Sequence, residues 1–132
     1  MIKDSVIDKV SDDLTVANIC EFFRDHMNSL VYFYHVSEVP SPKISTLKVF
    51  GKGELKIPLR TTESGTFMVL YANSDIANRL VEGSFKVASS RLAECVDMAN
   101  NLPGVNGVFV QGSNCWFTIG LAELNAGLNN NA

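Results

Sequence analysis

The chain has 132 residues, of which 46% are hydrophobic and 19% are charged, and its formal net charge is −3. This length fits one domain, and the apolar content is sufficient for a hydrophobic core, which excludes global disorder. No short window holds more than two basic residues, which argues against binding to nucleic acid or to an anionic membrane surface.

Two helices are predicted at the N-terminus. Residues 2–10 carry apolar side chains four positions apart and predict a short amphipathic helix. Ser11-Asp12-Asp13 suits the start of the next helix, because a capping side chain and acidic groups favour the positive helix end. This second helix is predicted over residues 13–27, with an apolar stripe that faces a sheet. The stripe consists of Val16, Ile19, Cys20, Phe23 and Met27.

The next segments predict a strand and a hairpin. Leu30–Val36 is rich in aromatic and β-branched residues, as is typical of a strand, and Pro40 and Pro42 mark the loop that follows. Residues 44–50 and 54–59 flank Gly51-Lys52-Gly53, and two such runs around a short glycine-containing loop predict a hairpin.

Two further features concern the middle of the sheet. Pro58 lacks an amide hydrogen, so it is expected at a sheet edge or a strand end. Residues 66–71 form a nearly continuous apolar run, which predicts a strand buried on both faces.

Helices and a short strand alternate after this buried strand. Residues 73–75 (Asn-Ser-Asp) cap a short helix that reaches about Val81 and closes at Gly83. Phe85–Ala88 is predicted as a short strand. Ser89-Ser90 then opens a helix to about residue 101, which Pro103-Gly104 ends. The buried face of that helix is predicted to hold Leu92, Cys95, Val96 and Ala99.

The C-terminal part predicts a second hairpin and a last short helix. Residues 105–110 and 115–119 flank Gln111-Gly112-Ser113-Asn114, and residues 121–128 suit a helical turn or two. The predicted fold is therefore a single α+β domain over residues 1–126, a mixed sheet with helices packed against it, followed by a flexible tail at 127–132. Periodicity does not give the strand order.

Residue types with reactive side chains are present but not arranged as a known motif. His26 lies near a helix end, where it can cap carbonyl groups, and His35 lies at a strand end as a half-exposed residue. Cys20, Cys95 and Cys115 are odd in number and widely spaced, which predicts buried reduced thiols rather than disulfides or a zinc site. The sequence therefore predicts no enzyme, no cofactor and no metal site.

Aromatic residues next to polar loops point to recognition instead. Trp116, the only tryptophan, follows the 111–114 loop, and it suits either the core or an interface anchor, with the core as the first interpretation. Tyr32 and Tyr34 share one face of their strand, opposite to Phe33. The predicted partner-binding residues are Gln111, Ser113, Asn114, Trp116, Tyr32 and Tyr34.

Four segments of the chain resemble the N-terminal domain of the enhanced-serine-sensitivity (SseB-like) proteins of bacteria. These segments are Phe22–Phe33, Leu55–Pro58, Gly65–Asp75 and Gly107–Ser113. The fourth departs from the family pattern, since Val110-Gln111 stands where the family has Asn-Pro. The resemblance implies an accessory or binding protein, of the kind associated with secretion systems or toxin immunity, without catalytic residues.

We therefore expect a non-enzymatic, cytoplasmic protein-binding domain, monomeric or homodimeric, that masks a partner protein. The N-terminus lacks the uninterrupted apolar stretch of a signal peptide, and no apolar run reaches the roughly 18–20 residues of a membrane span. The negative net charge favours a neutral or basic protein surface as the partner. The alternative is a small-ligand-binding or regulatory domain with a pocket near Trp116.

Overall fold

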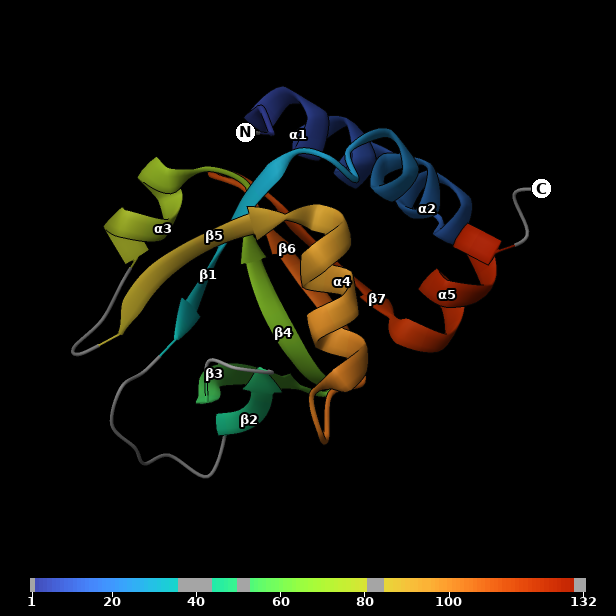
Figure 1. Cartoon of the computed structure of the whole chain (residues 1–132). Coiled ribbons are helices and arrows are strands. Elements are labelled where there is room, and N and C mark those ends of the chain that lie inside the picture. Colours follow the sequence, from blue (N-terminus) through green and yellow to red (C-terminus); the bar gives the residue numbers. More distant parts are fainter. Residues whose placement is uncertain (1, 36–43, 50–52, 81–84, 130–132) are drawn as a thin grey trace.

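The computed structural model describes residues 2–35, 44–49, 53–80 and 85–129; for residues 44–49 and 53–55 only the backbone is described. These residues form five helices and seven strands of a mixed sheet (Figure 1), so the predicted α+β fold class is confirmed. In chain order the elements are α1 (Asp4–Asp12), α2 (Val16–Asp25), β1 (Leu30–His35), β2 (Ile44–Val49), β3 (Gly53–Thr62), β4 (Gly65–Tyr71), α3 (Ser74–Leu80), β5 (Lys86–Arg91), α4 (Leu92–Asn101), β6 (Gly107–Gln111), β7 (Trp116–Gly120) and α5 (Leu121–Asn129).

Strand β4 lies at the centre of the sheet. Along one edge, residues 67–71 pair in parallel with β6. Along the other edge, β3 pairs antiparallel with residues 65–68, and β1 pairs antiparallel with the end of the strand, at Tyr71. The outer pairs are β1 with β5, β3 with β2 and β6 with β7, all antiparallel.

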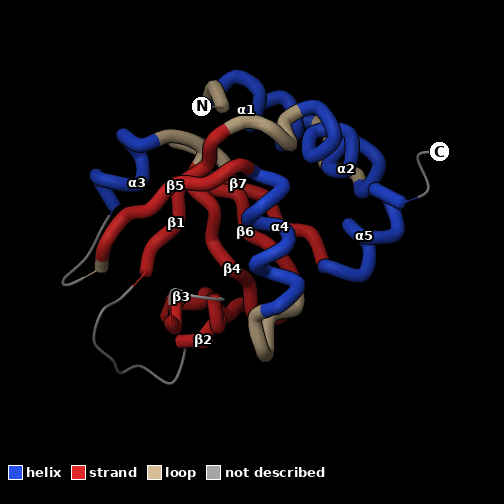
Figure 2. The backbone as a smooth tube through the Cα atoms, viewed as in Figure 1, coloured by secondary structure: helices blue, strands red, loops and turns tan. Residues whose placement is uncertain are grey.

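The register gives the sheet two different faces. Helix α2 packs on one face, where the rings of Phe22 and Phe117 meet edge to face with their centroids 5.4 Å apart. Helix α5 contacts β6, β7 and α2, and Figure 2 shows α1, α2 and α5 grouped together and α3 apart from them. The residues of this covered face are buried: Val31, Phe33, Met68, Leu70, Val108, Val110, Phe117 and Ile119.

The two N-terminal helices are confirmed, but the boundary between them was predicted wrongly. Helix α1 continues through Ser11 and Asp12, so these residues end the first helix instead of capping the second. The cap of α2 is Thr15, whose hydroxyl accepts a hydrogen bond from the Asn18 amide at 3.1 Å. Val16, expected in the buried stripe, is exposed.

Pro58 lies inside β3 and not at a strand end. The ladder with β2 ends where Pro58 faces Ile44, and the ladder with β4 begins where Leu59 faces Met68. The proline therefore lies where the strand changes its pairing partner, a position at which a missing amide hydrogen costs little. The predicted hairpin of β2 and β3 is confirmed.

The segment from β4 to α3 is also confirmed. Residues 67–71 of β4 are all buried. The Asn73 side chain caps α3, since its Oδ1 accepts a hydrogen bond from the Ile76 amide at 3.0 Å. Other predicted features, namely Val36, the loop with Pro40 and Pro42, the Gly51-Lys52 turn, and Val81 and Gly83, lie outside the described residues.

Strand β5 is longer than predicted, and this changes the start of α4. Ser89 and Ser90 belong to the strand and do not cap the helix. Pairing with β1 continues as far as Leu30 opposite Arg91, so the ladder keeps the chain extended past the two serines. The Arg91 amide then donates to Glu94 Oε1 at 3.1 Å, which satisfies one amide at the helix N-terminus. The predicted buried face of α4 is confirmed.

The second hairpin, β6 with β7, and the last helix are confirmed. Helix α5 runs to Asn129, so residues 127–129, predicted as part of a flexible tail, are helical. Arg24 Nη1 donates to the Gly127 carbonyl at 3.2 Å. A Cβ atom at Gly127 would overlap the Cys20 sulfur, so the end of α5 packs closely on α2.

Three further observations bear on the sequence predictions. The cysteines are free; Cys20 and Cys95 are buried and Cys115 is half-buried. None of the described helices is long and apolar enough to cross a bilayer. Within the described part of the chain, no three His, Cys, Asp or Glu side chains are grouped as a metal site would require.

Phe23 tests the core under α2. Its side chain is fully buried, so Phe23→Ala should lower the free energy of unfolding by about 3–5 kcal/mol, measured by urea denaturation. Val16→Ala is the matched control on the same helix, and it should change stability by no more than about 0.5 kcal/mol. An unchanged unfolding midpoint for Phe23→Ala would contradict this core.

Gly127 tests the packing of the C-terminal residues. We expect Gly127→Ala to destabilise the protein by about 1–3 kcal/mol, because the new methyl group overlaps Cys20. Adding Cys20→Ala removes the sulfur atom, which is the closer of the two Cys20 atoms to the new methyl group, so the double variant should be more stable than the sum of the two single changes predicts. Additive effects would show that α5 does not pack on Cys20.

Candidate functional site

The register brings several predicted recognition residues into one line across the sheet. Tyr32 faces Tyr71 across β1 and β4, Tyr71 faces Gln111 across β4 and β6, and Gln111 faces Trp116 across β6 and β7. Residues paired in this way point to the same side of a sheet. Tyr32, Tyr71, Gln111 and Trp116 therefore form one row on the face opposite to α2, which we call the aromatic row.

Trp116 is a surface residue. Its side chain is 54% exposed, which contradicts the interpretation of Trp116 as a core residue. The indole stacks on the ring of Phe109, with centroids 4.7 Å apart and an interplanar angle of 15°. The guanidinium carbon of Arg60 lies 4.6 Å from the centre of the same ring. Trp116 and Arg60 thus both cover Phe109, which is itself buried.

The loop between β6 and β7 is held against α1. The Ser113 amide donates to Asp4 Oδ1 at 3.1 Å, and Gln111 Nε2 donates to the Gly112 carbonyl at 2.8 Å. Ser113 and Asn114 are exposed. These two predicted residues therefore lie at the end of the sheet beside α1, whereas Gln111 belongs to the aromatic row.

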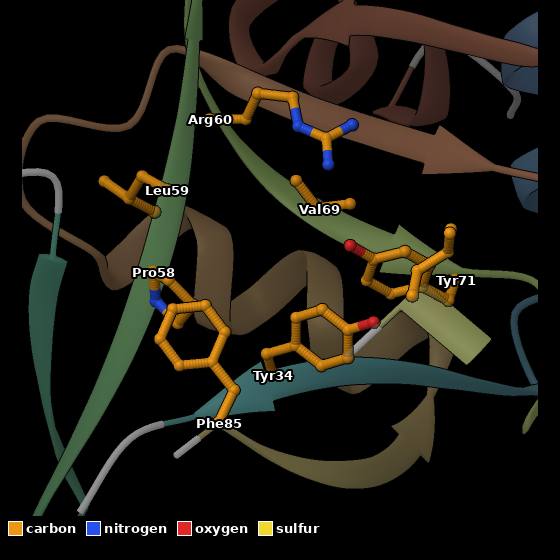
Figure 3. Close-up of a pocket in the computed structure, with 8 residues that line it drawn as sticks. Tyr34, Pro58, Leu59, Arg60, Val69, Tyr71 and Phe85 are labelled. Carbon is orange, nitrogen blue, oxygen red and sulfur yellow. The ribbon is translucent and has the colours of Figure 1, made fainter. Parts of the chain in front are cut away.

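A pocket of about 250 Å³ lies next to the aromatic row (Figure 3). It opens between β3 and β1, because these two strands pair with different parts of the same edge of β4. In the view of Figure 3, α4 lies behind the strands, so the pocket is on the face that this helix leaves uncovered. The lining residues are Tyr34, Pro58, Leu59, Arg60, Val69, Tyr71, Leu80 and Phe85.

Tyr34 forms a fixed wall of this pocket. Its hydroxyl donates to the Ala77 carbonyl of α3 at 2.6 Å. Its ring centroid lies 4.7 Å from that of Tyr71 and 5.9 Å from that of Phe85. Tyr34, predicted as a partner-binding residue, is therefore buried in the pocket wall. Tyr32, the other predicted tyrosine, is half-buried and belongs to the aromatic row.

Two polar groups face the pocket. Tyr71 is only 3% exposed, and Figure 3 shows its hydroxyl directed into the space beside Val69. No residue of the described chain forms a hydrogen bond with this hydroxyl. Arg60 is the only charged side chain among the described lining residues, and no described carboxylate pairs with it.

A second hollow, of about 810 Å³, lies between α1 and α2. It contains none of the predicted partner-binding residues. His26 contributes to it and caps α2 as predicted, since its Nδ1 lies 3.0 Å from the Phe22 carbonyl oxygen. Its acidic side chains are Asp12, Asp13, Glu21 and Asp25, and its apolar ones are Val6, Val10 and Phe22.

The thiols of Cys95 and Cys115 are not activated. Burial raises the pKa of Cys95 to about 12, with a further contribution from Glu94. Burial and the nearby Asp8 carboxylate raise the pKa of the Cys115 thiol. Both groups therefore remain protonated at neutral pH, and a protonated thiol is a poor nucleophile.

Comparison of the chain with models of protein families, with curated proteins and with solved structures finds no match. The resemblance to the SseB-like N-terminal domain stays a prediction from the sequence.

Sequence reasoning missed Arg60, Tyr71 and Phe109 as site residues. The strand containing Arg60 was predicted to end at Leu59, and the apolar runs containing Tyr71 and Phe109 were interpreted as core. An arginine directly after the apolar run Ile57-Pro58-Leu59 was the available signal for a charged group at a sheet face. Its neighbours depend on long-range pairing, which periodicity does not reveal.

His35, which follows Tyr34 at the end of β1, gives the stability of the fold a pH dependence. Burial lowers the pKa of His35 below 6.5, and so does Lys86, which faces it across β1 and β5. The folded state thus favours neutral imidazole, so this contribution to stability is complete above about pH 6.5 and is lost as the pH falls through the lowered pKa. Urea midpoints at pH 7.5 and 5.5 should differ less for His35→Gln than for the parent chain.

Lys86→Gln is the control for the charge contribution in this titration. It retains the histidine but removes the adjacent positive charge, so its pH dependence should lie between those of the parent and His35→Gln. Equal pH dependence in all three proteins would mean that His35 titrates normally.

Proposed function

We propose that this chain is a non-enzymatic protein-binding domain that contacts its partner through Arg60 and the accessible members of the aromatic row, Trp116, Gln111 and Tyr32. The observation that carries the proposal is the exposed Trp116 stacked on buried Phe109. Tryptophan, tyrosine and arginine are the residues in which interface binding energy concentrates. A tryptophan already stacked on a fixed ring loses little conformational freedom when a partner covers it.

The local charge refines the expected partner. The net charge of −3 suggests a neutral or basic partner, but the charged side chain described in the aromatic-row region is Arg60. Contact at this face is therefore expected with a neutral or mildly acidic protein surface. A nucleic acid would require a basic stripe, and a single arginine does not provide one.

The biological role proposed here follows the resemblance to SseB-like domains. We infer an accessory or immunity protein of a bacterial cell that acts in the cytoplasm, as a monomer or homodimer, and masks a partner protein. The 111–114 loop, held by Asp4, supports this proposal because a fixed loop beside the row enlarges the surface without an ordering cost.

The second candidate function is the binding of a small ligand. It is favoured by the pocket of about 250 Å³, whose walls combine aromatic rings with two polar groups. Ligand sites commonly have this composition, with few polar groups placed in a largely apolar hollow.

Trp116→Ala tests protein binding. We expect quantitative mass spectrometry of affinity-captured material from the native cell to show at least a tenfold loss of one specific protein, because truncation of a hot-spot residue removes about 2 kcal/mol or more. Leu14→Ala is the matched control, since Leu14 is similarly exposed (55%) but lies between α1 and α2.

The fold should survive the Trp116 substitution. An exposed side chain leaves no internal cavity, and the lost stacking on Phe109 amounts to about 0.5–1.5 kcal/mol. If Trp116→Ala and Leu14→Ala capture the same proteins in the same amounts as the parent, the aromatic row is not the contact surface.

A further inference from the structure

We infer that the pocket beside the aromatic row binds a carboxylate carried by a small apolar group. In this arrangement Arg60 and the Tyr71 hydroxyl hold the carboxylate, and the rings of Tyr34 and Phe85 contact the apolar part. The inference rests on the second candidate function, ligand binding in the pocket, and it does not require protein contact at the aromatic row.

Arg60 supplies the positive charge. Its guanidinium lies over the Phe109 ring at 4.6 Å, which orients the side chain while leaving its N–H groups without a described carboxylate partner. A planar guanidinium presents paired donors that match the two oxygens of a carboxylate. Because Arg60 is the only charged side chain of the described lining, no described acidic group opposes an anion there.

Tyr71 supplies a second donor. Its side chain is almost entirely buried, yet its hydroxyl has no hydrogen-bond partner among the described residues. The hydroxyl oxygen itself is not fully buried, so it reaches the pocket and can donate a hydrogen bond to water or to a ligand there. Figure 3 shows the hydroxyl directed into the pocket, where an anionic oxygen would satisfy it.

The size and lining of the pocket select the rest of the ligand. Tyr34, Val69, Leu80 and Phe85 provide apolar or aromatic walls, and the hydrogen bond to Ala77 fixes Tyr34 in place. A cavity of roughly 150 Å³ suffices for a benzene molecule. About 250 Å³ therefore accommodates one ring or branched alkyl group together with a carboxylate. Figure 3 shows the Arg60 guanidinium and the Tyr71 hydroxyl both beside Val69, where one carboxylate can meet both donors.

Two sources offer this chemistry. One is a free organic acid with an aryl or branched alkyl group. The other is the C-terminal residue of a protein chain, whose main-chain carboxylate stands beside an apolar side chain. The shared feature is a carboxylate within a few bonds of an apolar group.

The experiment is a titration of the ¹⁵N-labelled full chain, followed by amide chemical shifts. The probes are 3-phenylpropionate and 3-methylbutyrate, each compared with its neutral amide. A peptide Gly-Ser-Gly-Ser-Phe, with a free or an amidated C-terminus, represents the chain end. We expect at least one acid to bind about tenfold or more tightly than its neutral amide, because the neutral compound cannot form the charge-assisted hydrogen bond. The chemical shifts of backbone N–H groups in the strands that line the pocket should change on binding.

Three variants connect the preference to the named groups. Arg60→Gln should abolish the preference for the acid over the amide, and Tyr71→Phe, which removes only the unpaired hydroxyl, should weaken acid binding severalfold. Arg79→Gln is the matched control, because Arg79 is an exposed arginine of α3 outside the lining, and it should leave affinity unchanged.

The outcomes separate this inference from the functions proposed above. Equal binding of acids and amides would overturn the carboxylate assignment but leave ligand binding in place. Absence of binding by every probe would overturn both. Binding of the peptide acid at least as tight as that of the free acids would identify a chain end, and binding of the free acids alone would identify a small molecule. None of these results depends on Trp116, so loss of partner capture is a separate failure.

Discussion

The arrangement of the molecule depends on the pairing of β4. A strand has two hydrogen-bonding edges, and one edge of β4 is occupied by β6 along residues 67–71. Strands β3 and β1 must therefore share the other edge, where β3 takes residues 65–68 and β1 meets Tyr71. The two strands diverge from this shared edge, and the pocket lies in the space between them. The change of partner within β3 also explains why Pro58 is tolerated in mid-strand.

The same pairings determine which residues meet on the open face. Side chains alternate along each strand, so the register at Tyr71 makes Tyr32 and Gln111 point to the same side as Tyr71. Trp116 points to this side too, because it pairs with Gln111. Helices α2 and α5 occupy the opposite side, where Phe117 meets Phe22. Trp116 and Phe117 are adjacent in sequence, and alternation alone places one at the surface and the other in the core.

Local patterns in the sequence predicted most elements, because helical and strand periodicities depend on neighbours within a few residues. Several predictions failed where distant contacts override local preference. Ser89 and Ser90 favour a helix cap, but the ladder with β1 keeps them extended. The Gly- and Asn-rich C-terminal residues suggest a tail. However, Gly127 contacts Arg24 and Cys20 of α2, and helix α5 continues through residues 127–129.

The candidate site was less predictable than the fold for the same reason. Gln111, Trp116 and Tyr32 could be selected by residue type, yet their alignment depends on three separate strand pairings. In the sequence, Tyr71 and Phe109 lie in apolar runs that indicate buried strands. Only the assembled sheet shows that the Tyr71 hydroxyl faces a pocket and that Phe109 lies under Trp116.

Arg60 connects the two candidate surfaces. Its guanidinium covers the Phe109 ring on which Trp116 stacks, and the same side chain lines the pocket. A ligand that draws the guanidinium toward the pocket changes what covers Phe109. Ligand binding and partner contact would then share Arg60. Each would change the binding free energy of the other by the same amount. Trp116 belongs to the row alone, whereas the Tyr71 hydroxyl faces the pocket. Substitutions at these two positions therefore separate functions that a substitution at Arg60 combines.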